Sequence, residues 1–256
     1  MRIIRYQKGT NTPQTGWILD DMVGPVHGDI FTEYQRGEAT TPLSSVQLLP
    51  PLKPGKIICV GRNYAAHAQE HGAEVPEIPL LFFKPPSSVI GPEAYIILPP
   101  QSKQVEHESE LAVVIGKRGH WITPEDAFDH IFGYTIANDI TARDLQFSDG
   151  QWTRAKGFDT FCPLGPWIET DFDPADAMVT CHVNGEMRQM ASTRDMIFTI
   201  RQLIAFASSI MTLEPGDIFL TGTPAGVSPI SPGDIVETKV QGIGSLVNPV
   251  KTHSSR

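Results

Sequence analysis

The pattern of apolar and polar residues along the chain predicts many short strands. Runs rich in β-branched and aromatic residues alternate with turns that contain glycine or proline, and such runs are typical of strands that cross a buried core. The 22 glycines and 22 prolines favour short strands joined by turns over long helices. The segments expected to form strands, with a turn leading into each of the last two, are 1–6, 15–19, 46–49, 56–60, 80–84, 111–116, 133–139, 177–183, 215–220 and 232–237.

One long segment has the spacing of an amphipathic helix. Over residues 195–212, apolar side chains recur at every third or fourth position, as they do on the buried face of a helix. Shorter helices are predicted over 63–72 and 123–128, and a helix or turn is expected to begin at residue 141. Residues 156–166 are interrupted by glycine and proline and are predicted to form a loop.

A proline-rich segment near residue 50 divides the chain into two expected domains. Residues 50–55 contain three prolines, which cannot continue a helix or a central strand. We therefore expect a small N-terminal domain over 1–50 and a catalytic domain over 54–256. No candidate catalytic group precedes this boundary, so the first domain is expected to be scaffold.

The composition is that of an ordinary globular protein and excludes several classes of partner. Hydrophobic residues make up 40% and charged residues 19% of the 256 positions. The net charge of −9 argues against a nucleic acid or an anionic membrane as the main partner. No apolar run approaches the roughly 20 residues that span a bilayer. Cys59, Cys162 and Cys181 form an odd, sparse set without a signal peptide, which favours a reducing cytoplasm.

The most unusual polar stretch is residues 106–110, which leads directly into the buried strand at 111–116. Side chains alternate along a strand, so Glu106, Glu108 and Glu110 are expected on one face and His107 on the other. Neighbouring carboxylates in such a row are roughly 7 Å apart. They repel one another and resist desolvation, and a divalent cation would relieve both penalties. The alternative is a solvated acidic edge strand.

A metal hypothesis combines Glu108 and Glu110 with Asp139, the carboxylate that ends the strand at 133–139. Three carboxylates offer only oxygen donors, which suit Mg²⁺, Mn²⁺ or Ca²⁺, whereas zinc would favour His or Cys. About three of the six positions around an octahedral ion would stay open for water and substrate. That openness is typical of catalysis.

Other residues have the chemistry of acid/base or anion-binding groups. His67 and Glu70 are three positions apart and share a helix face, where Glu70 would orient the imidazole of His67 for proton transfer. Lys156 and Arg143 could hold anionic groups of a substrate, and the loop around Thr223 could offer a hydroxyl and backbone N–H groups. Each of these residues taken alone is also compatible with ordinary surface charge or a plain turn.

Several enzyme classes are excluded by missing motifs. The sequence has no G-x-x-x-x-G-K-[ST], G-x-G-x-x-G, G-x-S-x-G, H-E-x-x-H or C-x-x-C. Phosphate-loop, dinucleotide-binding and nucleophile-elbow enzymes are therefore not expected.

Taken together and in order, the motifs resemble those of the fumarylacetoacetate hydrolase superfamily. The match spans about residues 54–250. The matching segments are Val60-Gly61-Arg62-Asn63-Tyr64 followed by His67, Phe83-Lys84-Pro85, His107-Glu108-Ser109-Glu110-Leu111, Asp139-Ile140-Thr141-Ala142-Arg143-Asp144, Lys156-Gly157-Phe158-Asp159, Leu220-Thr221-Gly222-Thr223-Pro224-Ala225-Gly226-Val227, Gly242-Ile243-Gly244 and Asn248-Pro249-Val250.

The resemblance implies a β-rich α+β fold with a rolled mixed sheet in the catalytic domain, a homodimer, and a Mg²⁺ or Mn²⁺ site. It implies that the metal ligands are Glu108, Glu110 and Asp139, with Lys156 beside the metal. It also implies that Arg143, Gln146 and Thr223 lie near the substrate carboxylate and that His67 and Glu70 form the acid/base pair. Glu106 falls outside this pattern and is expected at the rim or behind the ligands.

The activity implied is metal-dependent chemistry on a small 2-oxo or β-diketo acid through an enolate. Hydrolysis of the carbon–carbon bond of acylpyruvates, or decarboxylation of oxaloacetate, is our first expectation. The alternative is isomerisation of 2-hydroxyhepta-2,4-diene-1,7-dioate or decarboxylation of 5-oxopent-3-ene-1,2,5-tricarboxylate, in which Arg62 could bind a second carboxylate. A further alternative, from a different class, is a metal- or ligand-binding protein without catalysis.

Overall fold

The chain folds as a β-rich protein in a computed structural model that describes residues 1–70, 72 and 74–253. The strands are β1 (Arg2–Gln7), β2 (Gln14–Leu19), β3 (Met22–Gly28), β4 (Tyr34–Arg36), β5 (Thr41–Pro42), β6 (Gln47–Leu49), β7 (Ile57–Gly61), β8 (Leu80–Lys84), β9 (Val89–Ile90), β10 (Ile96–Leu98), β11 (Val105–Glu106), β12 (Ser109–Ile115), β13 (Ile131–Asn138), β14 (Thr141–Ala142), β15 (Cys162–Glu169), β16 (Met178–Val183), β17 (Glu186–Ser192), β18 (Ile218–Leu220), β19 (Ile235–Val240) and β20 (Gly244–Thr252). The helices are α1 (Ala65–Glu70), α2 (Arg143–Asp149), α3 (Thr153–Lys156) and α4 (Ile200–Ile210), with 3₁₀ turns η1 (Leu43–Ser45), η2 (Pro86–Ser88), η3 (Ala127–His130) and η4 (Thr193–Asp195).

The main sheet runs through the whole molecule. Its strand order is β4-β3-β2-β1-β15-β13-β12-β18-β7-β8, with β18 and β7 parallel and the other neighbours along this path antiparallel. Every residue of β12 is buried because strands flank it on both edges and core side chains cover both faces. The strand that follows the glutamate-rich segment is therefore the centre of the fold, as its apolar sequence indicates.

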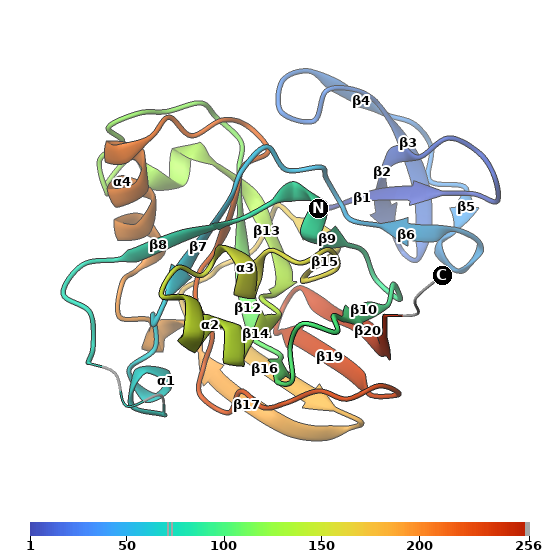
Figure 1. Cartoon of the computed structure of the whole chain (residues 1–256). Helices are drawn as coiled ribbons and strands as arrows, with labels where there is room; N and C mark the ends of the chain where they lie inside the picture. Colours follow the sequence, from blue (N-terminus) through green and yellow to red (C-terminus); the bar gives the residue numbers. More distant parts are fainter. Residues whose placement is uncertain (71, 73, 254–256) are drawn as a thin grey trace.

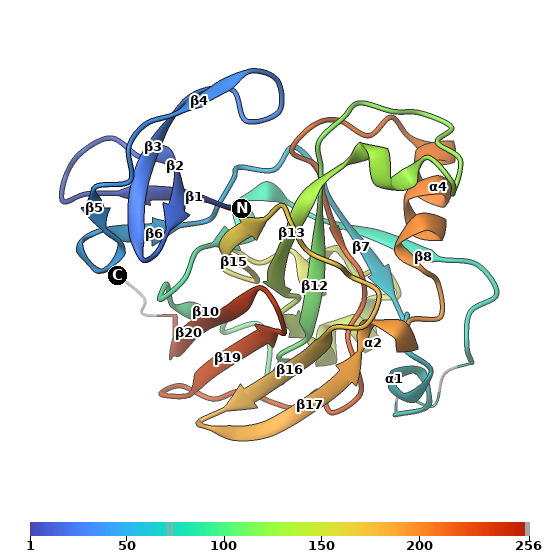
Figure 2. The same cartoon turned by 180° about the vertical axis from the view of Figure 1, so that it is seen from behind.

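A second sheet closes the core from the other side (Figure 1). Its order is β10-β20-β19-β16-β17, and Figure 2 shows these strands lying across the central strands of the main sheet. Val113 of β12, Val179 of β16, Val240 of β19 and Ile204 of α4 belong to one buried cluster. The expected β-rich α+β class with mixed sheets is confirmed.

The N-terminal strands are joined to the rest of the molecule through backbone pairing. Arg2 and Ile3 of β1 pair with Glu169 and Ile168 of β15. In Figure 1 the strands β1–β6 form one end of the main sheet and stand to one side of its central strands and of the second sheet, away from α1, α2 and α3. The division into two domains near residue 50 stays a prediction.

The loop predicted over 156–166 is wrong in its second half, where β15 begins at Cys162 and runs through Pro163 and Pro166. Proline lacks a backbone N–H and is tolerated in strands at irregular pairing. The register between β13 and β15 shifts between Tyr134 and Ile136, which provides such an irregularity.

Two predicted helices also differ from the structure. The helix expected over 195–212 begins only at Ile200, because Thr199 and Gln202 form a capping box in which each side chain accepts the other's backbone N–H. The helix expected over 123–128 is a turn followed by η3. The segment at 63–72 contains α1 (six residues), and Gly72 beyond it has a φ of +60°. No helix within the described residues is long and apolar enough to cross a membrane.

Candidate active site

Three buried carboxylates come together where β12 begins and β13 ends. Glu110 lies on β12, and Asn138 at the end of β13 pairs with the first residue of β12. The Asp139 N–H donates to the carbonyl of Glu108 (2.8 Å), which places the two residues side by side. Carboxylate oxygens of Glu108, Glu110 and Asp139 all lie within 4.8 Å of one another. The antiparallel register therefore assembles the three residues that the sequence predicts as ligands.

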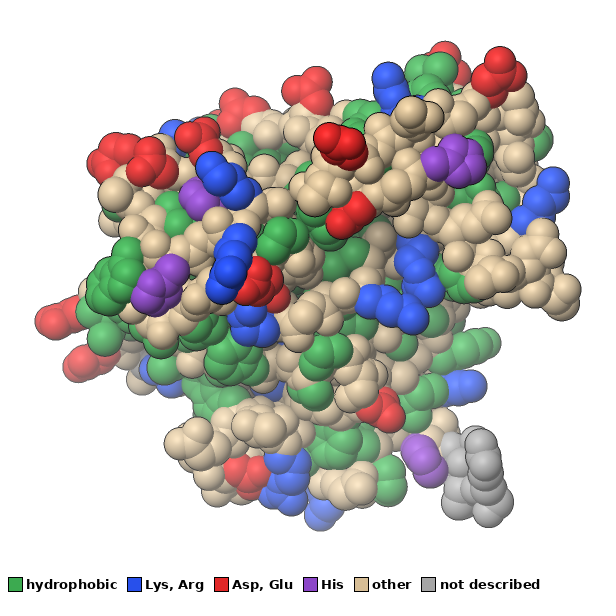
Figure 3. All heavy atoms as spheres, turned by 90° about the horizontal axis from the view of Figure 1, so that it is seen from above, with side chains coloured by type: hydrophobic (Ala, Val, Ile, Leu, Met, Phe, Trp, Pro, Cys, Tyr) green, Lys and Arg blue, Asp and Glu red, His purple; other side chains and the backbone are tan. Residues whose placement is uncertain are grey.

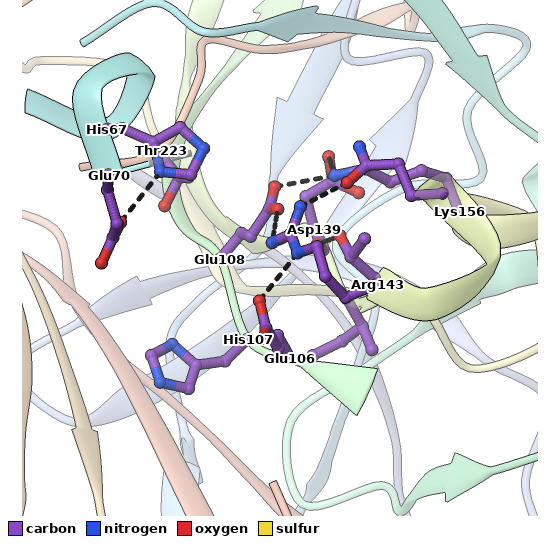
Figure 4. A network of polar contacts seen from close by, with 12 residues as sticks. His67, Glu70, Glu106, His107, Glu108, Asp139, Arg143, Lys156 and Thr223 are labelled. Atoms are coloured by element: carbon purple, nitrogen blue, oxygen red, sulfur yellow. Dashed lines mark hydrogen bonds and ion pairs between the residues drawn. The ribbon is translucent and has the colours of Figure 1, made fainter. Parts of the chain in front are cut away.

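Two cations neutralise part of this cluster (Figure 4). The Lys156 ammonium donates to Glu108 Oε2 and to Asp139 Oδ2, both at 2.7 Å. Arg143 donates from Nη2 to Glu108 Oε1 (2.6 Å) and from Nε to Glu106 Oε2 (2.7 Å). Glu106 is thus buried behind Glu108 and tied to it through one guanidinium, instead of lying at an exposed rim.

Arg143 and Gln146 both face the cavity, yet much of their hydrogen-bonding capacity is already used. Besides its two carboxylate contacts, Arg143 donates from Nη1 to Gln146 Oε1 (2.5 Å). The guanidinium therefore holds the protein's own carboxylates in place. Its predicted contact with a substrate carboxylate would have to use the remaining N–H groups.

Sequence reasoning missed one charged residue of the cluster, Lys84. Its ammonium donates to Asp139 Oδ1 (2.7 Å) and to the carbonyl of Ile140 (3.1 Å), and its side chain is 0% exposed. The signal was present, because Lys84 closes the apolar run at 80–84 and is followed by two prolines. A lysine fixed in that position is buried and requires a carboxylate partner.

The two glutamates of the cluster differ in their electrostatics. Burial alone would raise the pKa of Glu108, but Lys156 and Arg143 hold it well below its usual range. Burial, followed by the charges of Asp139 and Glu108, raises the pKa of Glu110 well above its usual range. No lysine or arginine among the described residues forms an ion pair with Glu110, whose carboxylate accepts the Gly222 N–H at 2.7 Å. Among the three carboxylates, ionised Glu110 would therefore be stabilised most by a bound cation.

The predicted acid/base pair forms on α1. His67 Nδ1 lies 3.4 Å from Glu70 Oε2, and the two oxygens of Glu70 accept the Gly226 N–H at 3.1 and 3.2 Å. Figure 4 shows His67 on the side of Thr223 and Glu108, with Glu70 behind it. The His67 side chain is 8% exposed, so the imidazole is buried in the same cavity as the carboxylates.

One cavity of about 180 Å³ contains these groups. It is lined by Val60, Gly61, Arg62, His67, Phe82, Glu108, Glu110, Asp139, Arg143, Gln146, Phe147, Trp152, Lys156 and Thr223. All of the predicted site residues except Glu70 are in this lining. The volume is below the range of about 300–1,000 Å³ of drug-sized pockets, which favours a small ligand.

Arg62 lines the same cavity and has an uncommon backbone conformation. Its φ is +59°, and its guanidinium lies 6.0 Å from the centre of the Trp152 ring. Trp152 packs so closely on the preceding Gly61 that a Cβ there would come within 2.7 Å of the indole. Within the described part of the chain, no carboxylate pairs with Arg62. Its charge is therefore directed at the cavity or at solvent.

The hydroxyl of Thr223 and the ring of His107 are both held by Gln189. Thr223 Oγ1 donates to the carbonyl of Ser109 (2.9 Å) and accepts from Gln189 Nε2 (2.8 Å). His107 lies on the opposite side of its segment from the carboxylates and contacts Gln189 Oε1 and Ser228 Oγ, both at 2.9 Å. His107 is thus a structural residue of the second sheet interface, as strand alternation indicates.

The residues fit a hard divalent cation. The donor set is three buried carboxylates with converging oxygens, and one of them, Glu110, has no cationic partner in the described structure. Such all-oxygen sets suit Mg²⁺ or Mn²⁺.

Comparison with known families agrees with the fold and the site. Residues 56–251 match the family described as fumarylacetoacetate (FAA) hydrolase C-terminal, and residues 1–51 match the family Rv2993c-like, N-terminal. The chain belongs to the fumarylacetoacetate hydrolase family, whose members are enzymes.

The similar proteins include tautomerases and isomerases. The mitochondrial oxaloacetate tautomerase FAHD2B of Bos taurus is 45% identical over 98% of this chain and 91% of that protein. The crystal structure of 5-carboxymethyl-2-hydroxymuconate delta-isomerase from Mycobacterium smegmatis is 44% identical, with a TM-score of 0.92 over 99% of this chain and 100% of that chain. The 2-hydroxyhepta-2,4-diene-1,7-dioate isomerase from Mycobacterium marinum is 41% identical, with a TM-score of 0.91 over the full length of both chains.

Proposed function

We propose that this enzyme uses a divalent metal to interconvert the keto and enol forms of a small 2-oxo diacid such as oxaloacetate. The observation that carries the proposal is the placement of His67 in the same cavity as the three converging carboxylates. Proton transfer at the carbon next to a 2-oxo group needs a base beside a site that stabilises the enolate oxygen. Similarity to an oxaloacetate tautomerase and to two isomerases supports this reaction type.

The metal would be Mg²⁺ or Mn²⁺ held by Glu108, Glu110 and Asp139. When bound, the ion would supply Lewis acidity toward the 2-oxo group and the adjacent carboxylate of the substrate. Lys156 adds a positive charge at the same end of the cavity, 2.7 Å from two of the proposed ligands. Developing negative charge on the substrate oxygen is thereby stabilised by groups that are already in position.

His67 is the group proposed to move the proton at carbon. In the direction from ketone to enol it takes a proton from the carbon next to the 2-oxo group, and protonation of the enolate oxygen completes the enol. In the reverse direction the enol oxygen loses its proton and His67 delivers one to that carbon. Glu70 accepts from the imidazole and favours its protonated form, which is the form that exists between these two steps. Glu70 is itself fixed by the Gly226 N–H, so the imidazole has a defined orientation.

Arg62 is proposed to bind the second carboxylate of the substrate. It lines the same cavity as the cluster and has no carboxylate partner among the residues described. A left-handed φ at a residue other than glycine has an energetic cost that is typically retained for function. The small cavity volume favours a four-carbon acid over the seven-carbon dienedioate.

A second candidate is hydrolysis of the carbon–carbon bond of acylpyruvates, our first expectation from the sequence. The His67–Glu70 pair favours it, because the same imidazole could activate a water molecule. Decarboxylation of oxaloacetate requires the same enolate without that water. Both reactions use the residues assigned above, so product analysis separates them.

A substrate panel tests the proposal. Protein freed of metal with a chelator is given the enol form of oxaloacetate, acetylpyruvate, fumarylpyruvate or 2-hydroxyhepta-2,4-diene-1,7-dioate, with Mg²⁺, Mn²⁺ or no metal. Absorbance of the conjugated enol and NMR of the products follow each reaction. We expect conversion of oxaloacetate enol to ketone to be fastest and to require added metal. Equal rates with and without metal, or faster cleavage of an acylpyruvate, would contradict the tautomerase assignment.

A further inference from the structure

Asp139 is the one proposed ligand whose two oxygens each accept a lysine. Lys84 contacts Oδ1 and Lys156 contacts Oδ2, both at 2.7 Å. Lys156 lines the cavity, whereas Lys84 approaches from β8 behind Asp139 and is absent from the cavity lining. We therefore expect Lys84 to act on the reaction through Asp139 and through its charge, without contact with a substrate.

The charges of the cluster are close to balance in a way that depends on Lys84. Four carboxylates, those of Glu106, Glu108, Glu110 and Asp139, are grouped with three cations, Arg143, Lys84 and Lys156. Ligation through Glu110 requires its deprotonated form, so all seven groups are counted as ionised. Their net charge is then one negative unit without a divalent ion and one positive unit with it. A monoanionic 2-oxo carboxylate then brings the buried centre to neutrality. Without Lys84, the metal-loaded centre would already be neutral before the substrate carboxylate arrives.

We infer that Lys84 is a positioning residue that limits divalent-metal affinity so that the loaded centre keeps a positive charge for the substrate carboxylate. A buried ammonium 2.7 Å from a ligand carboxylate opposes a second cation on that carboxylate. Burial leaves this repulsion poorly screened by water and salt. Lys84 thus weakens metal binding, and its positive charge strengthens the attraction of the metal-loaded centre for an anionic substrate. The inference rests on the metal site assigned under the proposed function.

The test measures binding of Mn²⁺ alone to metal-free wild-type protein and to Lys84→Gln. Glutamine keeps a donor toward Asp139 and the Ile140 carbonyl but removes the charge. We expect the dissociation constant for Mn²⁺, from electron paramagnetic resonance of the free ion, to fall at least tenfold. We also expect KM for a 2-oxo acid to rise and kcat to fall. A residue with a purely structural role would weaken metal binding or leave it unchanged.

Two further variants keep the result decisive. Lys84→Arg retains the charge, so its affinity for Mn²⁺ should stay within about threefold of wild type. Lys56→Gln removes a lysine that contacts buried Asp217 at 2.6 Å outside the cavity, and it should not change Mn²⁺ affinity. If Lys84→Gln is less stable than wild type without metal, its melting temperature should still rise by more than that of wild type at the same Mn²⁺ concentration, which also supports the inference.

The outcomes separate this inference from the proposed function. Unchanged or weaker Mn²⁺ binding by Lys84→Gln, in a protein that melts cooperatively, would overturn the role of Lys84 alone. Failure of the wild-type protein to bind Mn²⁺ would overturn the metal site itself, and the inference with it.

Discussion

The carboxylate cluster and the His67–Glu70 pair line or adjoin one cavity but are held in different ways. Glu110 belongs to the central strand of the main sheet. The Asp139 N–H donates to the carbonyl of Glu108, and Lys156 forms ion pairs with both Glu108 and Asp139. His67 and Glu70 lie on a six-residue helix, and Glu70 is anchored to the loop at Gly226 by one N–H group. A cation site requires fixed geometry and a buried field, which a central strand supplies. A proton-transfer group needs only to reach its substrate, for which a short helix is sufficient.

The largest effect is expected from removing a proposed metal ligand of the carboxylate cluster. Glu110→Gln keeps an acceptor for the Gly222 N–H and leaves no cation unpaired, because no described lysine or arginine pairs with Glu110. We expect it to fold with near wild-type stability but to lose Mn²⁺ binding and to lose turnover by about 10³-fold, since metal stabilisation is worth several kcal/mol. Calorimetric titration and steady-state kinetics measure both.

Asp139→Ala sharpens that contrast, because it leaves Lys84 and Lys156 without one of their carboxylates. Removal of one member of a buried ion pair typically costs about 3–5 kcal/mol. We expect a clear loss of unfolding free energy in denaturant as well as loss of activity. Equal stability of the Glu110→Gln and Asp139→Ala variants would refute the view that the lysines depend on Asp139.

In the helix region, His67→Asn should separate proton transfer from metal binding. We expect turnover to fall by about 10²–10³-fold, in the range typical of a lost general base, while the Mn²⁺ dissociation constant stays within about twofold. His120→Asn, at an exposed loop position, is the matched control and should leave both quantities unchanged. A parallel loss of metal affinity in His67→Asn would mean that α1 supports the cation site.

A smaller effect is expected at Arg62, which belongs to neither region. Arg62→Ala should raise KM for a 2-oxo diacid by about tenfold, because one charge-assisted contact is lost. KM for acetylpyruvate, which lacks the second carboxylate, should change by less than about twofold. If KM rose equally for both substrates, Arg62 would be supporting the cavity wall and not binding the second carboxylate.

The rigidity of the strands that carry the carboxylate cluster can also be tested in the wild-type protein, without a substitution. Cys59, Cys162 and Cys181 are buried in the core, and burial raises the pKa of Cys162 and Cys181 to about 12 and that of Cys59 well above its usual range. The thiolate is the reactive form, so none of the three should react with a thiol reagent at pH 8 unless the protein unfolds. Fast labelling of Cys59 or Cys162 in the native protein would show that the strands beneath the cluster open readily.

The same shifts set the sign of a pH effect on stability. Unfolded thiols ionise near pH 8.5, whereas the folded thiols stay protonated to higher pH. Between these values the folded state binds more protons, so the free energy of unfolding should decrease as pH rises above about 8.5. Below that pH these thiols contribute no pH dependence. Denaturant titrations at pH 7.5 and 9.5 measure the difference.

The sequence predicts the groups whose position follows from a regular pattern. Alternation correctly places Glu108 and Glu110 on one side and His107 on the other, although His107 and Glu108 lie in the short connection between β11 and β12 and not in a strand. Asp139 could be added because it ends the next strand, and antiparallel neighbours bring such ends together. His67 and Glu70 could be paired from helical spacing alone.

The rest depends on contacts that no local pattern encodes. Lys84 was overlooked because its partner is 55 residues away and is reached only after β8 joins the sheet. The hydrogen bonds from Arg143 to Glu106 and Glu108 could not be predicted without knowing that α2 packs against β11 and the residues that follow it. The helix α4 begins late because the cap at Thr199 outweighs the apolar spacing that precedes it. In each case a tertiary or capping contact decided between locally acceptable structures.

The location of Lys84 at the end of β8 couples the stability of this edge strand to the carboxylate cluster. β8 is the last strand of the main sheet, and an edge strand is normally among the first elements to fray. Here fraying would pull a buried ammonium away from Asp139, so the edge is fastened to the centre by charge. Backbone amides of β8 should therefore exchange with solvent at a rate that depends on what occupies the carboxylate cluster. Mass spectrometry of amide exchange at the edge strand β8 would therefore report on the occupancy of the carboxylate cluster at the centre of the sheet.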